Sequence, residues 1–169
     1  MSGHRDASGW RGVALAIAKE TIALREQVEA GNVRREAGEV VPFVDQWARI
    51  IEVIEAYAME RIDEDATYLA TVLRACMRRG TKRDGRNKGL LVWRSGAPKD
   101  TDARLFKRAL DWHRGKSGGY LGGPIGDAMF YGDRWDRADT AAMVLLLSTG
   151  CELKAVDRWR EALGMGASR

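Results

Sequence analysis

The sequence has 169 residues, of which 45% are hydrophobic and 31% are charged, and its formal net charge is +4 at neutral pH. This length and composition predict a folded protein with one sizeable core and exclude a disordered chain. Because no apolar run approaches the roughly eighteen residues of a membrane span and the N-terminus has no secretory apolar region, we expect a soluble cytoplasmic protein.

The net charge hides a strong asymmetry along the chain. Residues 74–116 contain fourteen Lys and Arg side chains against four acids, so the rest of the chain carries an excess of acids. Like charges that are concentrated in this way repel one another, and an anionic partner relieves that repulsion. The charge pattern therefore directs the search for a functional site to the middle of the chain.

The first predicted element is an amphipathic helix that begins near Trp10 and packs on a partner helix. Its apolar residues recur at spacings of three and four, which is the pattern of a helical seam. The seam comprises Trp10, Ala14, Ile17, Thr21, Leu24 and Val28. Gly38 can end the helical run in the left-handed conformation, and Pro42 suits the first turn of a following helix. The pattern predicts a helical hairpin.

The second arm of this hairpin starts near Val41, and a third helical segment covers roughly residues 65–79. The second arm carries a stripe of apolar residues that is wide enough to contact more than one neighbour. The stripe comprises Phe43, Val44, Trp47, Ile50, Ile51, Ile54, Tyr57 and Ala58. The segment ERIDEDAT between the two helices contains no Gly or Pro, so the third helix could also continue the second.

Beyond Gly80 the chain becomes a basic, turn-rich connector, GTKRDGRNKG, followed by the short apolar run LLVW, which we expect to be extended. A helix is predicted next, with Thr101 as its N-cap. Its inward-facing residues are expected to be Leu105, Phe106, Ala109 and Trp112. The glycine-rich residues 115–126 predict a loop.

The last third is again helical. The run DTAAMVLLLSTG is apolar on nearly all sides and should be buried, and CELKAVDRWREALG is amphipathic. Together, residues 141–163 have the outline of a helix-turn-helix. The whole chain is predicted to be all-α, with an N-terminal helical hairpin and a compact helical C-terminal half that carries the Gly-rich loop. Residues 1–80 and 81–169 form either two regions or a single domain.

The basic connector and its flanks are the predicted nucleic-acid-binding site. Long cations displace counterions from a phosphate backbone, and an aromatic face can stack on a base. The candidate residues are Arg74, Arg78, Arg79, Lys82, Arg83, Arg86, Lys88, Trp93 and Arg94. The alternative is a solvated charged loop beside a core tryptophan.

Other motifs predict chemistry less well. Glu52, Glu55, Glu60 and Asp63 lie at spacings that suit a magnesium ion, as in all-α nucleotide pyrophosphohydrolases, but a solvated helix face explains them better. The acids of GDAMFYGDRWDRAD beside Arg134 and Arg137 indicate ion pairs and helix starts.

The remaining candidate motifs are incomplete. Residues 115–117, Gly-Lys-Ser, lack the rest of a P-loop. Cys76 and Cys151 are expected to be buried small side chains, and His4 and His113 have no evident partner.

A resemblance to a known family rests on ALAIAKETIALREQVEAGNVRREAGEVVPFVDQWARIIEVIEA. This segment, roughly residues 13–56, resembles the helical region of small-subunit terminases of tailed bacteriophages, in which a charged helix ends at a Gly-Glu turn and a second helix follows. The resemblance implies a viral DNA-packaging protein, located in the host cytoplasm, that forms a homo-oligomer through the hairpin and delivers DNA to a motor subunit. The association residues would be Ile17, Leu24, Val28, Trp47, Ile51 and Ile54.

From these observations we expect a non-catalytic, oligomerising nucleic-acid-binding protein that uses no cofactor and no metal ion. Two alternatives remain open. One is a magnesium-dependent nucleotide hydrolase that uses the acids between Glu52 and Asp63. The other is a phage-encoded protein-interaction module or inhibitor whose basic face binds an acidic host protein.

Overall fold

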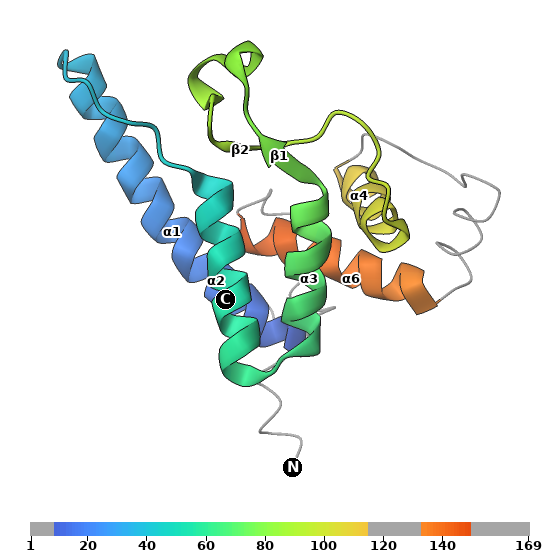
Figure 1. Cartoon of the computed structure of the whole chain (residues 1–169). Helices are drawn as coiled ribbons and strands as arrows, with labels where there is room; N and C mark the ends of the chain where they lie inside the picture. The colour runs from blue at the N-terminus through green and yellow to red at the C-terminus, as the bar shows by residue number, and fades with distance from the viewer. Residues whose placement is uncertain (1–8, 115–132, 150–169) are drawn as a thin grey trace.

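The computed structural model describes residues 9–114 and 133–149, and for residues 133–136 only the backbone. The described chain is helical apart from one small two-stranded hairpin, which confirms the all-α prediction (Figure 1). The elements are α1 (Gly9–Glu36), α2 (Gln46–Arg61), α3 (Glu64–Ala75), β1 (Met77–Arg79), the 3₁₀ segment η2 (Lys82–Asn87), β2 (Leu91–Trp93), α4 (Thr101–His113) and α6 (Asp133–Ser148). None of these helices is apolar over a length that could cross a bilayer.

The helices pack around a single hydrophobic core. Helix α2 packs between α1 and α3, and α3 also contacts α4. Helix α6 closes the core by packing on both α1 and α4, so it joins the N-terminal helical hairpin to the C-terminal half (Figure 1). The buried cluster draws residues from α1, α2, α3, α4 and α6, and includes Met77 at the start of β1.

The N-terminal hairpin follows its sequence pattern closely. On α1 the seam residues Ala14, Ile17, Thr21 and Leu24 are buried. The helix ends at Glu36. Just beyond it, Gly38 has a φ of 93°, and the amides of Gly38 and Glu39 donate to the carbonyls of Arg35 and Arg34. This is a Schellman ending, which uses a left-handed residue to satisfy the last carbonyls of a helix.

The start of α2 differs from the prediction. Pro42 lies four residues before the helix, which begins at Gln46 and is capped by the Asp45 carboxylate on the Ala48 amide. The cap therefore comes from Asp45, a residue type that favours this position. As the wide apolar stripe predicts, α2 contacts α1, α3 and β2.

A break separates α2 from α3. Ile62 adopts the left-handed conformation with a φ of 51°, and Asp63 then caps α3 by accepting a hydrogen bond from the Ala66 amide at 3.0 Å. The third helix is also shorter than predicted, because it ends at Ala75. Residues 77–79, which were expected to be helical, form β1 instead.

The basic connector is an ordered hairpin. β1 pairs antiparallel with β2, so that Met77 faces Trp93 and Arg79 faces Leu91, and the extended conformation predicted for LLVW is confirmed. Between the strands, two short 3₁₀ turns meet at Gly85. Gly80 is required by space, since a Cβ there would lie 2.1 Å from the Asn87 carbonyl oxygen.

Two details of α4 correct the sequence prediction. Its N-cap is Asp100, whose carboxylate accepts from the Ala103 amide at 2.9 Å, and Thr101 is the first helical residue. Leu105, Phe106 and Ala109 face the core as expected. Trp112 does not, because 43% of its surface is exposed. The apolar helix predicted for DTAAMVLLLSTG is confirmed as the buried part of α6.

Candidate nucleic-acid interface

The hairpin is attached to the helical body through Asp45. The carboxylate of Asp45 caps α2, accepts a hydrogen bond from the Leu91 amide at 3.1 Å, and pairs with the Arg79 guanidinium at 3.0 Å. Arg79 also donates to the Gly89 carbonyl at 3.2 Å. One carboxylate thus fixes the start of α2, the edge of β2 and the side chain of a predicted phosphate contact. Arg79 serves this attachment.

Arg78 is engaged inside the hairpin. Its guanidinium makes two hydrogen bonds, at 2.9 and 3.1 Å, to the carboxylate of Asp84, the one acid between residues 74 and 94. The same carboxylate accepts from the Thr81 amide at 2.6 Å. Both donors hold the pKa of Asp84 well below its usual value, with Arg78 as the larger cause. Asp84 therefore stays charged and holds the turn closed.

Arg74 is paired with helix α2. Its guanidinium binds the Glu55 carboxylate with two hydrogen bonds, at 2.6 and 2.8 Å. The pKa of Glu55 is lowered by this hydrogen bond, and the pKa of Arg74 is raised by it. A two-point pair of this kind orients both side chains along the surface between α2 and α3. Arg74 is thus a link between two helices.

Trp93 and Arg94 also serve the attachment of the hairpin. The Trp93 ring packs edge-on against Trp47 of α2, with centroids 5.1 Å apart, and the Arg114 guanidinium lies 5.5 Å from the same ring. Trp93 is half-buried in this arrangement, so part of its ring is used to pack the hairpin on α2. Arg94 donates from Nε to the Met77 carbonyl at 3.1 Å and so closes the end of the two strands.

The remaining candidate cations are on the far turn of the hairpin. Lys82, Arg83 and Lys88 are exposed, and none of their side chains forms a salt bridge or hydrogen bond with any residue in the described ranges. Arg86 is exposed as well, with its guanidinium 5.5 Å from the Phe43 ring. We call these four residues the hairpin tip. Figure 1 shows this turn projecting away from the helices.

The predicted association residues lie mostly inside the molecule. Ile17, Leu24, Ile51 and Ile54 are at most 2% exposed, because α1 and α2 use their apolar stripes to pack on each other and on α3 and α6. Val28 and Trp47 are half-buried. Four of the six residues are therefore already covered by the chain's own core, which corrects their assignment to a surface between subunits.

In the described part of the chain, the acids of α2 and the α3 cap Asp63 do not assemble into a metal site. Glu55 is held by Arg74, and Asp63 accepts hydrogen bonds from the Ala66 amide and, at 2.7 Å, from the Gly9 amide. Glu52 and Glu60 are exposed. Within residues 9–114 and 133–149 no three His, Cys, Asp or Glu side chains lie close enough to share a metal ion. The carboxylates act instead as caps and ion-pair partners.

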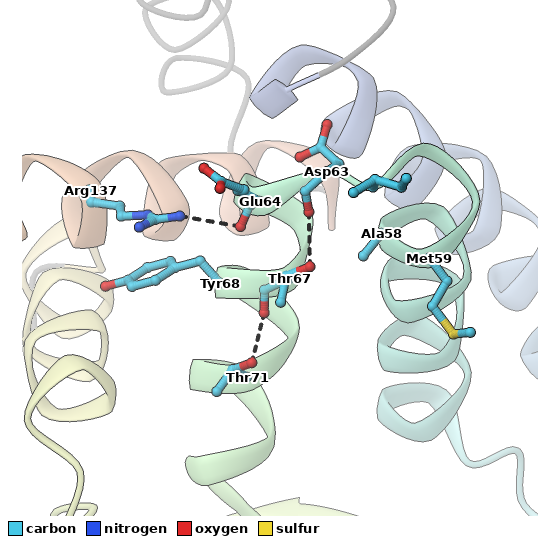
Figure 2. A pocket seen from close by; sticks show the side chains of 9 residues that line it. Ala58, Met59, Asp63, Glu64, Thr67, Tyr68, Thr71 and Arg137 are labelled. Atoms are coloured by element: carbon cyan, nitrogen blue, oxygen red, sulfur yellow. Dashed lines mark hydrogen bonds between the residues drawn. The ribbon is translucent and has the colours of Figure 1, made fainter.

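A cavity of about 640 Å³ lies between α2 and α3, beside these acids. Figure 2 shows Thr67 and Thr71 on the α3 wall, Ala58 and Met59 on α2, and Arg137 of α6 at the side. Both threonine hydroxyls donate to carbonyls of their own helix, and Arg137 donates to the Glu64 carbonyl at 3.2 Å. The hydroxyls of Thr67 and Thr71 and the Arg137 guanidinium are thus engaged with the fold.

Sequence reasoning also missed a pair between α4 and α6. His113, at the end of α4, lies with Nε2 2.6 Å from the Asp139 carboxylate of α6. The pair supports the packing of α4 on α6. Nothing in the local sequence indicates it, because the two residues are 26 positions apart. Cys76 is fully buried, as expected, and burial raises its pKa to about 12.

Several sequence predictions fall outside the described residues. They concern the Gly-rich loop at 115–126, the amphipathic segment that follows Gly150, and therefore the second half of the helix-turn-helix outlined at 141–163. Cys151, Asp127 and His4 also lie there. Comparisons with protein-family models, with curated proteins and with solved structures give no match for this chain.

Proposed function

We propose that the protein binds nucleic acid through the hairpin tip. The observation that supports this is the state of Lys82, Arg83 and Lys88, which are exposed and unpaired within the described residues while the cations at the base of the hairpin are engaged. Unpaired cations that project on an ordered turn match the requirement for displacing counterions from a phosphate backbone.

The proposal lowers the number of expected phosphate contacts. The sequence alone suggests six or more, whereas the tip offers four cations, with Arg86 shared with Phe43. Four contacts on duplex DNA predict that affinity falls on the order of a hundredfold between 50 and 200 mM salt, compared with roughly a thousandfold for six contacts. The salt dependence therefore distinguishes the tip from the whole basic segment.

DNA is the first ligand to test. A two-stranded hairpin can enter a groove of a duplex or follow its backbone. The resemblance of residues 13–56 to small-subunit terminases favours the same ligand, and a packaging role in a phage would follow from it. Because Trp93 is packed against Trp47, we expect the tip to contact phosphates without stacking on bases.

The test compares two double variants that lose the same charge. Binding of a labelled 20-base-pair duplex and of a single strand is measured by fluorescence anisotropy at 50, 100 and 200 mM salt. Lys82→Ala with Arg83→Ala should reduce the slope of log K against log salt by about 1.8 on the duplex, since two phosphate contacts are lost. Lys19→Ala with Arg25→Ala, on the exposed face of α1, is the matched control and should leave the slope unchanged.

Equal effects of the two double variants would contradict the proposal, because they would show that affinity follows net charge alone. Unchanged binding in both variants would also contradict it. Circular dichroism and the urea midpoint of each variant check the fold, and neither should change, because these side chains are exposed and have no partner within residues 9–114 and 133–149.

A further inference from the structure

A second basic site lies away from the hairpin tip, in a cavity beside α4. The cavity has a volume of about 420 Å³, and its walls are the loop at residues 95–98 and one face of α4. The α4 side chains that line it are Arg104, Lys107, Arg108 and Asp111. Because these positions are spaced by three and four residues, they share one face of the helix.

The charges on this face do not balance. Lys107 pairs with Asp111, with Nζ 3.0 and 3.3 Å from the two carboxylate oxygens, so the one acid in the lining is already used. Arg104 and Arg108 remain, and neither forms a salt bridge with any residue between 9 and 114 or between 133 and 149. Two cations that face a cavity without a carboxylate partner make it a site for an anion.

Arg104 provides an independent observation. Its Nε atom is buried and has no hydrogen-bond acceptor in the described part of the chain. A buried donor without a partner is costly and rare in folded proteins, and it usually marks the place of a water molecule or a ligand. A charged guanidinium makes the cost larger, and an oxyanion that binds the other nitrogens of the Arg104 fork in the cavity would offset it.

The size and the charge of the cavity define the class of ligand. Arginine presents a planar fork of donors that matches the oxygens of a phosphate, and two unpaired arginines favour a doubly charged group over a single carboxylate. The volume falls within the range of small-molecule sites and is larger than a phosphate ion alone needs. A phosphate that is attached to a small organic group fits both properties.

We propose that this cavity binds the phosphate group of a small phosphorylated molecule, with Arg104 and Arg108 as its ligands and Lys107 at the side. The site does not depend on the hairpin tip, because no residue of the tip lines the cavity. Ser95, which also lines the cavity, offers a hydroxyl to the same ligand.

The test uses defined probes on the full chain. Inorganic phosphate, adenosine 5′-monophosphate and adenosine are titrated separately, with binding followed by calorimetry and, for the two phosphates, by ³¹P NMR. Phosphate and the monophosphate should bind and adenosine should not. Arg104→Gln should weaken phosphate binding by tenfold or more, and Arg104→Lys should weaken it less, because lysine keeps the charge but loses the fork.

Two further variants keep the outcome unambiguous. Arg108→Gln changes an exposed side chain and should also weaken phosphate binding, so the test stands if the half-buried Arg104→Gln does not fold. Lys82→Ala with Arg83→Ala removes two cations from the hairpin tip and should leave phosphate binding unchanged. If neither phosphate binds, or if the Arg104 and Arg108 variants bind as the original chain does, the proposal is overturned.

A short oligonucleotide is the last probe. If only the oligonucleotide binds, and if its binding depends on Arg104, the small-ligand proposal is overturned and the cavity becomes part of the nucleic-acid interface. If the oligonucleotide depends on the hairpin tip and free phosphate depends on Arg104, the protein has two separate anion sites, as proposed.

Discussion

The base and the tip of the β-hairpin are equally basic in sequence, yet they differ in what their cations do. At the base, Arg74, Arg78 and Arg79 are paired with Glu55, Asp84 and Asp45. At the tip, Lys82, Arg83 and Lys88 have no such partner among the described residues. Two of the base partners belong to α2 or cap it, whereas the turn of the hairpin projects past the nearest ends of α2 and α3 (Figure 1).

The cations of one basic run in a sequence can therefore have two different roles in the folded protein. Part of it maintains the fold, and only the remainder is available to a ligand. Removing a base cation leaves a carboxylate without its partner, so it should act on stability first. Removing Lys82, Arg83 or Lys88 leaves no partner behind in the described structure, so it should act on binding alone. Variants at the base and at the tip can therefore be told apart by whether stability or binding changes.

The largest effect on stability is expected at Asp45. Asp45→Ala removes the cap of α2, the acceptor of the Leu91 amide and the partner of Arg79 in one step. We expect a loss of roughly 2–3 kcal/mol in the free energy of unfolding, from about 1 kcal/mol for the cap and about 1–2 kcal/mol for a part-buried amide left unpaired. Urea denaturation measures it.

Asp45→Asn is the matched control for this change. It keeps an oxygen that can cap α2 and accept from Leu91 but loses the charge that pairs with Arg79. Its cost should therefore be clearly smaller than that of Asp45→Ala. Equal midpoints for Asp45→Ala and the original chain would show that the hairpin does not depend on this attachment, and the distinction between base and tip would fail.

Asp84→Asn should release Arg78, one of the cations at the base of the hairpin, so that it can contact a phosphate. Asp84→Asn weakens the hold on Arg78 while it keeps an oxygen that can accept from the Thr81 amide. If the tip binds nucleic acid, duplex affinity at 100 mM salt should rise roughly fivefold, and the salt slope should steepen by about 0.9, because one more cation reaches a phosphate. Fluorescence anisotropy measures both quantities.

Glu29→Gln changes the net charge by the same amount on the exposed face of α1 and serves as the control. It should leave the salt slope as it is. An affinity that rises equally in both variants would mean that the freed guanidinium contributes nothing beyond its effect on net charge.

Sequence periodicity predicts the helices of this fold well, because each apolar stripe is a local pattern. The seam from Ala14 to Leu24 and the left-handed ending at Gly38 needed only neighbouring residues. The break at Ile62 had no such signal, since a β-branched residue rarely adopts a positive φ. Asp63, a good cap that precedes two further acids, was the available indication of a new helix start.

The candidate site was predictable in its location but not in its composition. The sequence located the basic cluster at residues 74–94, but it did not tell which cations are paired. Arg79 meets Asp45 across 34 positions and Arg74 meets Glu55 across 19, and such pairings arise only when the helices pack. The α4 cavity was missed for the same reason, because the loop at 95–98 supplies its second wall.

The smallest expected effect concerns the pair between Glu55 and Arg74. Both side chains remain partly exposed, at 37% and 50%, so solvent screens the pair and its contribution should be at most about 1 kcal/mol. Glu55→Gln should lower the free energy of unfolding by a few tenths of a kcal/mol to that limit near neutral pH. Urea midpoints for both chains measure the difference.

The pH dependence of that difference identifies its cause. Arg74 holds the pKa of Glu55 below the ordinary 4.5, so the pair stabilises the folded state above about pH 4.5, and this contribution is lost as the pH falls through the lowered value. The two chains should therefore converge in stability in acid, while Glu26→Gln on α1 should show no such convergence. A gap that persists unchanged at low pH would assign the effect of Glu55 to packing, and Arg74 would then belong with the available cations of the tip.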